Sequence, residues 1–262
     1  MEKEIALMNR VAVEAGRIAR TFQEKGFEQK ADKSKGDPFL TEADLAIDAY
    51  LKAEITKAFP NDAWLSEETV ADDKRLTAHR CWIVDPIDGT KDFIDRTGSF
   101  AVSIGLAVEG RAVLGAVVAP MRDQYVLGVV GQGIWLNGQR HTLGPAKTLA
   151  ESTCSISSRD EAKGLWEPYK KHFQVHIMGS IAYKMARAAL GVEDLTISLT
   201  PKALWDVCAG DAILQAAGCR STDRQGNPLH YDQPGLEVAG CIGCRAEVYA
   251  EVLALLGHKN AA

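Results

Sequence analysis

The chain has 262 residues, of which 46% are hydrophobic and 25% charged, and its formal net charge is −5. This length and composition indicate a globular protein with one large domain or two closely associated halves. The acidic balance argues against a nucleic-acid polymer as partner, because such a protein usually carries a basic face. No stretch reaches about 18 uninterrupted apolar residues, so we expect no membrane-spanning segment.

The amino-terminal residues are acidic and amphipathic and lack the apolar core of a signal peptide. The six cysteines are scattered, as is typical of reduced thiols in a cytosol, so we expect a cytoplasmic protein. Cys241 and Cys244 form a lone C-x-x-C pair. Because no second pair or nearby histidine accompanies it, packing is favoured over zinc binding.

Apolar spacing predicts two helices at the start of the chain. Residues 4–25 carry apolar side chains on one helical face, and Gly26 would end that helix. Thr41 opens a second helix that ends at Pro60, and Thr41 and Asp44 have a spacing similar to that of a capping box, so Asp44 could serve only this helix. The intervening residues 27–38 are polar and lysine-rich. A solvated loop is favoured there, with a mobile basic lid over a phosphate site as the alternative.

The next stretch predicts an antiparallel sheet. Residues 61–68 run from a turn into a short apolar segment that ends in two glutamates, of which one is expected to face a site. Residues 100–136 alternate as four strands broken at glycine-rich turns, and Asn137-Gly138 is a strong hairpin signal, so these strands are expected to form a meander.

The second half alternates strands with helices, which indicates an α/β layer joined to the first sheet. We expect strands at 153–158, 173–178, 195–199 and 237–242, and helices at 181–191, 206–218 and 246–257. A composition shift at Gly144-Pro145 divides the chain into an α+β half, residues 1–145, and an α/β half, residues 146–262. We expect the two halves to form one catalytic unit.

The most informative stretch is residues 82–93, WIVDPIDGTKDF. A short buried strand ends at Asp85, Pro86 stiffens the turn that leads to Asp88, and Gly89 allows close approach of a ligand. Thr90 could cap a helix whose free N–H groups would face an anion. Two carboxylates aimed at one point repel each other unless a cation lies between them, which favours Mg²⁺ with a phosphate over an ordinary acidic turn.

Further acids stand at the ends of predicted elements, namely Asp44, Glu67 and Asp206. The role of Asp206 could be only that of a first-turn charge on its helix. If these acids converge with Asp85 and Asp88, they cannot all stay ionised without cations, and two or three Mg²⁺ would resolve the repulsion. Other phosphatase nucleophiles are excluded, because Pro86 occupies the place of an aspartate nucleophile and no cysteine has an arginine six positions on. A metal-activated water is therefore the expected nucleophile.

The motifs LTEAD (40–44), SEE (66–68), DPIDGT (85–90) and LWDVCAG (204–210) together resemble the signatures of the inositol monophosphatase family, in order and spacing over nearly the whole chain. The resemblance implies a layered α-β-α-β-α fold, a Mg²⁺-dependent phosphomonoesterase, inhibition by Li⁺ and, commonly, a homodimer. It also implies in-line attack by metal-activated water without a covalent intermediate.

Carried over by position, the resemblance implies a set of site residues. The metal ligands would be Glu67, Asp85, Asp88, Asp206 and the backbone carbonyl of Ile87. Asp44 and Thr90 would orient and deprotonate the attacking water, with Glu67 in contact with it. The substrate would be bound by Asp88, Gly89, Thr90, Lys91, Gly179, Ser180 and Asp206.

The substrate remains open among inositol 1-phosphate, 3′(2′),5′-bisphosphate nucleotides and histidinol phosphate. Inositol-specific relatives place a glutamate seven residues before the second-half aspartate, where this chain has Leu199. Lys91 resembles relatives that hydrolyse the other two substrates, and it could pair with a second phosphate or be a solvated lysine. A catalytically inactive metal- or metabolite-binding relative is the alternative outside the enzymes.

Overall fold

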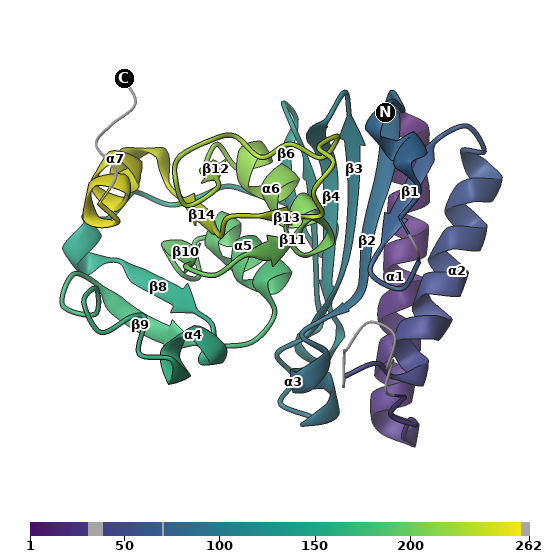
Figure 1. Cartoon of the computed structure of the whole chain (residues 1–262), viewed down its shortest axis with the longest axis horizontal. Helices are drawn as coiled ribbons and strands as arrows, with labels where there is room; N and C mark the ends of the chain where they lie inside the picture. Colours follow the sequence, from purple (N-terminus) through teal and green to yellow (C-terminus); the bar gives the residue numbers. More distant parts are fainter. Residues whose placement is uncertain (31–38, 70, 258–262) are drawn as a thin grey trace.

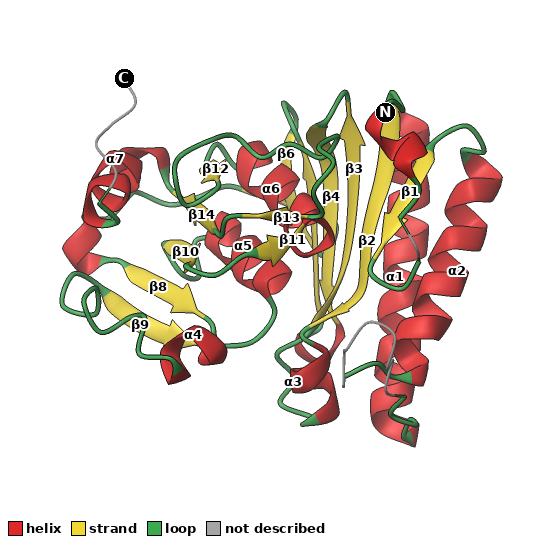
Figure 2. Ribbon diagram, in the orientation of Figure 1, coloured by secondary structure: helices red, strands yellow, loops and turns green. Residues whose placement is uncertain are grey.

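The computed structural model describes residues 1–30, 39–69 and 71–257. The elements form five layers in the order helices, sheet, helices, sheet, helix (Figure 1). The layers are clear when helices and strands are coloured separately (Figure 2). The α-β-α-β-α arrangement predicted from the sequence is confirmed. Residues 31–38 of the expected 27–38 loop lie outside the described residues.

Helices α1 (Glu2–Lys25) and α2 (Glu42–Ala58) cover the outer face of the first sheet (Figure 1). Their apolar faces and that face of the sheet form one buried cluster, in which Met8, Val11 and Ile47 are fully buried. Thr41 caps α2 as expected, since its hydroxyl accepts a hydrogen bond from the backbone N–H of Ala43 at 3.2 Å.

The first sheet has seven strands that lie in chain order. They are β1 (Ala63–Ser66), β2 (Arg80–Asp88), β3 (Ala101–Val108), β4 (Arg111–Ala119), β5 (Gln124–Val129), β6 (Gly133–Leu136) and β7 (Gln139–His141). Strands β1 and β2 are parallel, and every later pair is antiparallel, so the predicted meander over 100–136 is confirmed. The short helix α3 (Thr90–Ile94) follows β2, and three 3₁₀ turns, η1 (Asp73–Leu76), η2 (Pro120–Arg122) and η3 (Leu149–Glu151), lie in connections.

The middle layer consists of α5 (Ile181–Leu190) and α6 (Leu204–Ala216). Helix α6 packs on the inner face of the first sheet across a row of three glycines, because Gly105, Gly115 and Gly128 are paired in register on β3, β4 and β5. A Cβ atom at these positions would collide with Cys208, Ala209 and Ile213 of α6. The helix therefore lies closer to the sheet than any side chain there would permit.

The second sheet has the strand order β12 (Arg220–Thr222), β14 (Cys241–Cys244), β10 (Leu195–Ser198), β8 (Thr153–Ile156) and β9 (Gln174–Ile177). Strands β8, β9 and β10 are parallel, whereas β14 is antiparallel to both of its neighbours. Helix α7 (Ala246–Leu255) covers its outer face, α4 (Ser158–Ala162) follows β8, and β11 (Lys202–Ala203) pairs with β13 (Glu237–Val238).

Two predicted strands are wrong in extent. The expected strand at 237–242 is two strands in different sheets, β13 and β14, because Gly240 turns the chain with φ +77° and lies against the Ser198 carbonyl. The strand expected at 153–158 ends at Ile156, because the Ser157 hydroxyl accepts from the Asp160 N–H and so caps α4.

The expected boundary at Gly144-Pro145 falls between β7 and η3. One buried cluster contains residues of both halves, including Leu65 of β1 and Leu214 of α6. The division into two halves stays a prediction. No described helix is long and apolar enough to cross a membrane.

Candidate active site

Three aspartates converge where β2 ends and α6 begins. One carboxylate oxygen each of Asp85, Asp88 and Asp206 lies within 4.8 Å of the others. Residues three apart on a regular strand point to opposite faces, but the register of β2 against β3 shifts between Asp85 and Asp88. This irregularity at Pro86-Ile87 lets both carboxylates point to one side, where the first turn of α6 supplies Asp206.

Backbone and hydroxyl donors hold each of these carboxylates. The Ser180 hydroxyl and the Ala182 N–H both donate to Oδ2 of Asp88, each at 2.6 Å. The Ile87 N–H donates to Asp85 at 3.0 Å, and the Ala203 N–H donates to Asp206 at 3.1 Å. The cluster is therefore positioned by donors from β2, from β11 and from the start of α5.

Asp88 and Asp206 line a cavity of about 330 Å³, whereas Asp44, Asp85 and Ile87 are not among its lining residues. Of the residues expected at the site, Glu67, Asp88, Gly89, Thr90, Lys91, Gly179, Ser180 and Asp206 line it. Of the Glu67-Glu68 pair, one member of which was expected to face a site, Glu67 lines this cavity. Gly89 has φ +92° and a Cβ atom there would press on Ser99 and Ser180, so only glycine fits without strain.

Burial raises the pKa of every acid in the cluster, and repulsion from neighbouring carboxylates adds to it at Glu67, Asp85 and Asp206. Burial and then Asp88 raise the pKa of Asp206 to about 7. Burial and then Glu67 raise that of Asp85, and burial and then Asp206 raise that of Glu67. Burial also raises the pKa of Asp88, although the bonds from Ser180 and Ala182 oppose the change. Such a group of oxygen donors is suited to a hard divalent cation, which would relieve the repulsion.

Asp44 and Thr90 have other partners in this structure. The Thr41 N–H donates to Asp44 at 2.8 Å and the Thr41 hydroxyl donates to the same oxygen, so Asp44 closes the expected capping box. Burial raises the pKa of Asp44 to about 7. The Thr90 hydroxyl donates to the Ile87 carbonyl at 3.0 Å. The predicted capping role of Thr90 is wrong by one residue, because Gly89 is the cap of α3 and Thr90 is its first residue.

Two positions that bear on the substrate also differ from expectation. The Lys91 ammonium lies at the cavity but forms an ion pair with Asp95 one turn further along α3. Leu199 packs against the apolar cluster of the second sheet instead of lining the cavity. Leu199 therefore does not present an apolar side chain to the substrate, although it occupies the sequence position of the polyol-binding glutamate.

Sequence reasoning missed several residues at or beside the site, including two lysines and an aspartate. Lys184 of α5 and Lys202 of β11 line the cavity, and Asp48 of α2 accepts from the Ser66 hydroxyl at 2.5 Å, directly before Glu67. Asp48 lies one turn after Asp44 on the same helix face, a spacing that could have identified it. Lys184 sits in an amphipathic helix, where a lysine ordinarily faces solvent, so the sequence carries no signal for its burial.

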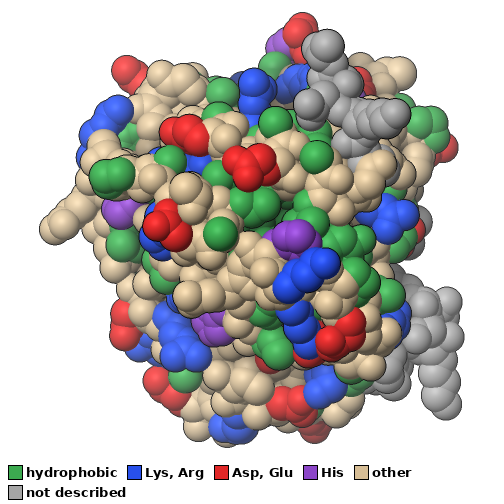
Figure 3. Space-filling model, turned by 90° about the vertical axis from the view of Figure 1, so that its left-hand side faces the viewer, with side chains coloured by type: hydrophobic (Ala, Val, Ile, Leu, Met, Phe, Trp, Pro, Cys, Tyr) green, Lys and Arg blue, Asp and Glu red, His purple; other side chains and the backbone are tan. Residues whose placement is uncertain are grey.

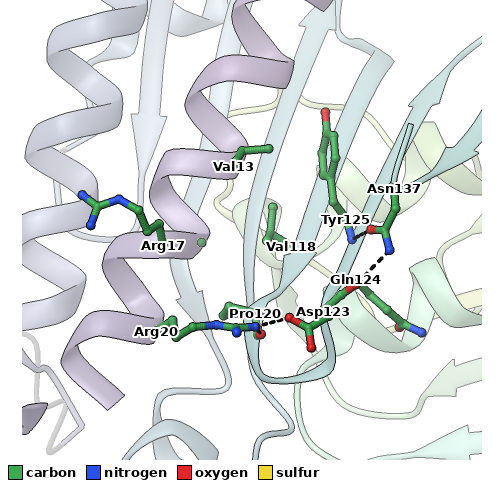
Figure 4. Close-up of a pocket in the computed structure, with 10 residues that line it drawn as sticks. Val13, Arg17, Arg20, Val118, Pro120, Asp123, Gln124, Tyr125 and Asn137 are labelled. Carbon is green, nitrogen blue, oxygen red and sulfur yellow. Dashed lines mark hydrogen bonds and ion pairs between the residues drawn. The ribbon is translucent and has the colours of Figure 1, made fainter. Parts of the chain in front are cut away.

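A second cavity, of about 320 Å³, lies between α1 and strands β4 and β5 (Figure 4). Its polar groups are already paired. Arg20 bonds the Pro120 carbonyl and Asp123, while Asn137 accepts from the Tyr125 N–H and donates to the Asp123 carbonyl (Figure 4). We therefore assign the chemistry to the acid-lined cavity.

Comparison with known proteins agrees with this site. The model of the inositol monophosphatase family matches residues 2–257. The inositol-1-monophosphatase of Rhizobium meliloti is 30% identical over 94% of this chain and 93% of its own length, and the Nus factor SuhB of Salmonella typhimurium is 31% identical over 92% of each. The 3′(2′),5′-bisphosphate nucleotidase CysQ of Aggregatibacter actinomycetemcomitans is 29% identical over 85% of each.

Among solved structures, the IMPase of Thermotoga maritima superposes with a TM-score of 0.84 at 24% identity, over 98% of this chain and 97% of that one. This similarity shows the fold. Together with the fold and the acid cluster, the sequence relatives place the protein in the class of phosphoric monoester hydrolases. The chain belongs to the inositol monophosphatase family.

Proposed function

We propose that the protein hydrolyses a small phosphate monoester of the inositol 1-phosphate type in a Mg²⁺-dependent reaction. The observation that carries this proposal is the convergence of Asp85, Asp88 and Asp206, of which Asp88 and Asp206 line a cavity of about 330 Å³, a volume suited to a small metabolite. The 30% identity to the inositol-1-monophosphatase of Rhizobium meliloti supports it. A 3′(2′),5′-bisphosphate nucleotide is the second candidate substrate, favoured by the basic residues that line the same cavity.

The donor set fits Mg²⁺. Glu67, Asp85, Asp88, Asp206 and the Ile87 carbonyl would supply oxygen ligands, and this carbonyl also accepts a hydrogen bond from the Thr90 hydroxyl. Two or three ions would balance the negative charge of these acids. When bound, Mg²⁺ lowers the pKa of a coordinated water and stabilises negative charge on the phosphate and on the leaving oxygen.

The remaining roles belong to side chains and backbone of the chain. Asp44, with its pKa raised to about 7, is suited to accept a proton from water near neutral pH. Thr90 would orient that water together with Asp44, by turning its hydroxyl from Ile87, and Glu67 would contact it. The N–H groups of Gly89 and Thr90 would bind the phosphate, while Gly179 and Ser180 would lie against the organic part of the substrate.

Family analogy supports three further proposals: inhibition by Li⁺, a homodimeric assembly and a cytoplasmic location. Li⁺ titration of phosphate release tests the first, and light scattering of the purified protein tests the second.

One assay tests the function. Phosphate release should be measured from inositol 1-phosphate, adenosine 3′,5′-bisphosphate and histidinol phosphate in parallel, with Mg²⁺ and with EDTA. We expect release that requires Mg²⁺ and that falls by about 10²-fold or more in kcat in Asp88→Asn, because one positioned charge is lost. Asp73→Asn, an exposed acid in η1, is the matched control. Full activity in EDTA would contradict the proposal, and Mg²⁺ binding without any release would favour an inactive relative.

A further inference from the structure

Helix α2 carries two acids, Asp44 and Asp48, on its buried face, with exposures of 1% and 8%. Acids ordinarily stand at the surface, as they do on the outer face of the carboxyl-terminal half, where they are intermingled with basic and apolar side chains (Figure 3). The two acids of α2 are four residues apart, so they lie one turn from each other on the same side of the helix. Asp44 closes the capping box with Thr41, whereas Asp48 lies outside both this cap and the acid cluster.

The two carboxylate oxygens of Asp48 bind the two ends of one short turn. Oδ1 accepts from the Ser66 hydroxyl at 2.5 Å, and Oδ2 accepts from the Thr69 hydroxyl at 3.2 Å. Ser66 and Thr69 flank the Glu67-Glu68 pair. Both Asp48 and Ser66 are buried, and hydrogen bonds to an ionised acceptor are stronger than those between neutral groups. A single side chain of α2 therefore spans and holds the turn that carries Glu67.

Further bonds within the turn extend this restraint to the backbone of Glu67. The Glu68 N–H donates to the Ser66 hydroxyl oxygen, and the Thr69 N–H donates to the Ser66 carbonyl, each at 3.4 Å. The Glu67 N–H donates to the Val84 carbonyl of β2 at 3.3 Å. The backbone of Glu67 is thus held from two sides, by the strand that carries two of the cluster aspartates and by α2.

The same helix also places Asp44 close to Glu67. Burial and the charge of Asp206 raise the pKa of Glu67, and the charge of Asp44 adds to them, so the two side chains lie within electrostatic reach of each other. Asp44 and Asp48 belong to one continuous helix that packs against β2. Helix α2 therefore sets the position of Asp44 directly and that of Glu67 through Asp48.

We infer that Asp48 is a positioning residue, which holds Glu67 in the orientation that binds a divalent cation and acts through its hydrogen bonds to Ser66 and Thr69. This inference rests on the proposed function, in which Glu67 is a metal ligand. Loss of a hydrogen-bonding partner behind a metal ligand typically lowers metal affinity or activity by about 10–100-fold, because the ligand then samples other orientations. Asp48 does not line the cavity, so its loss should act on cation binding more than on the reaction of bound substrate.

The test measures Mg²⁺ binding to the purified full chain by calorimetry and, in parallel, the Mg²⁺ dependence of phosphate release. In Asp48→Ala we expect the Mg²⁺ dissociation constant, and the Mg²⁺ concentration for half-maximal release, to rise by about 10-fold or more. At saturating Mg²⁺, kcat should change far less than this concentration does. Ser66→Ala should shift both quantities in the same direction. The double variant should be no weaker than Asp48→Ala alone, because both substitutions remove the same bond.

Two further variants separate positioning from general stability. Asp48→Asn keeps an oxygen that accepts from Ser66 and gains an amide that donates to the Thr69 hydroxyl, so its Mg²⁺ dissociation constant should stay close to that of the wild-type protein. Ile55→Val, on the same buried face of α2, should lower Tm without changing that constant. If Asp48→Ala does not fold, Ser66→Ala, Thr69→Val and Asp48→Asn decide.

Wild-type affinity for Mg²⁺ in both Asp48→Ala and Ser66→Ala would overturn the inference while the phosphatase function stands. A loss in Asp48→Asn as large as that in Asp48→Ala would also overturn it, because the charge of Asp48 and not its hydrogen bonds would then be responsible. If the wild-type protein binds Mg²⁺ but releases no phosphate, the proposed function fails, and calorimetry of the same variants decides the role of Asp48 separately.

Discussion

The acid cluster should make the metal-free protein less stable as the pH rises. The pKa of Asp206 lies near 7 in the folded chain, because burial and Asp88 disfavour its charge, against 3.8 for a free side chain. A folded-state pKa raised in this way contributes stability below about pH 4, which is lost as the pH rises through about 7. At about 1.4 kcal/mol per pH unit, the loss attributable to Asp206 alone approaches about 4 kcal/mol. Glu67, Asp85 and Asp88 act in the same direction.

Thermal unfolding in a chelator measures this effect. Between about pH 5 and pH 8 we expect Tm to fall by about 10 °C, at roughly 2–4 °C per kcal/mol for a chain of this size. Mg²⁺ should restore Tm most strongly at the upper end of the range, because it binds the ionised acids. Asp206→Asn removes the charge at similar volume and should flatten the dependence, whereas Asp73→Asn should not. A Tm in chelator that stays constant or rises over this range would refute the reasoning.

Three further predictions concern residues around the site. Thr41→Val removes a hydroxyl that lowers the pKa of Asp44, so this pKa should rise further above about 7. The pH profile of kcat/KM should then shift to higher pH. A profile that does not shift would show that Asp44 is not the group that takes the proton. Gly115→Ala places a methyl group against Ala209 and should lower the free energy of unfolding in urea by about 1–3 kcal/mol, whereas Gly144→Ala, which meets open space, should not. Lys91→Ala should change kcat/KM by less than about 3-fold, since its exposed ammonium is paired with Asp95; a larger loss would show that Lys91 leaves Asp95 for the substrate.

Much of the site could be predicted from the sequence, because its acids stand at the ends of elements and occur in a recognisable order. The turn at 85–90 identified Asp85 and Asp88, and LWDVCAG placed Asp206 in the first turn of a helix. Their convergence depended on the family resemblance, since no local pattern places residue 206 beside residue 85. The strand meander over 100–136 could also be predicted, because alternation of apolar and polar residues and glycine-rich turns are local signals.

The remaining features depend on tertiary contacts. The inward orientation of Lys184 follows from how α5 packs between two sheets, and a helical pattern does not distinguish a buried lysine from a solvated one. The split of 237–242 follows from the positive φ of Gly240 against Ser198, which lies far away in sequence. Leu199 has the right spacing for a substrate contact, yet its side chain joins a separate apolar cluster.

The glycine row beneath α6 has a consequence for how the site can change. Ala209 meets Gly105 and Gly115 within one helical turn of Asp206, so the spacing between helix and sheet sets where that carboxylate stands relative to Asp85 and Asp88. A single added methyl group at one of these glycines would push α6 away from the sheet and displace the Asp206 carboxylate relative to Asp85 and Asp88. None of the three acids would itself be changed. Substitutions in the middle of the sheet could therefore change which cation is preferred and how tightly it binds. Screens for altered metal dependence should recover substitutions at these glycines as well as at the acids.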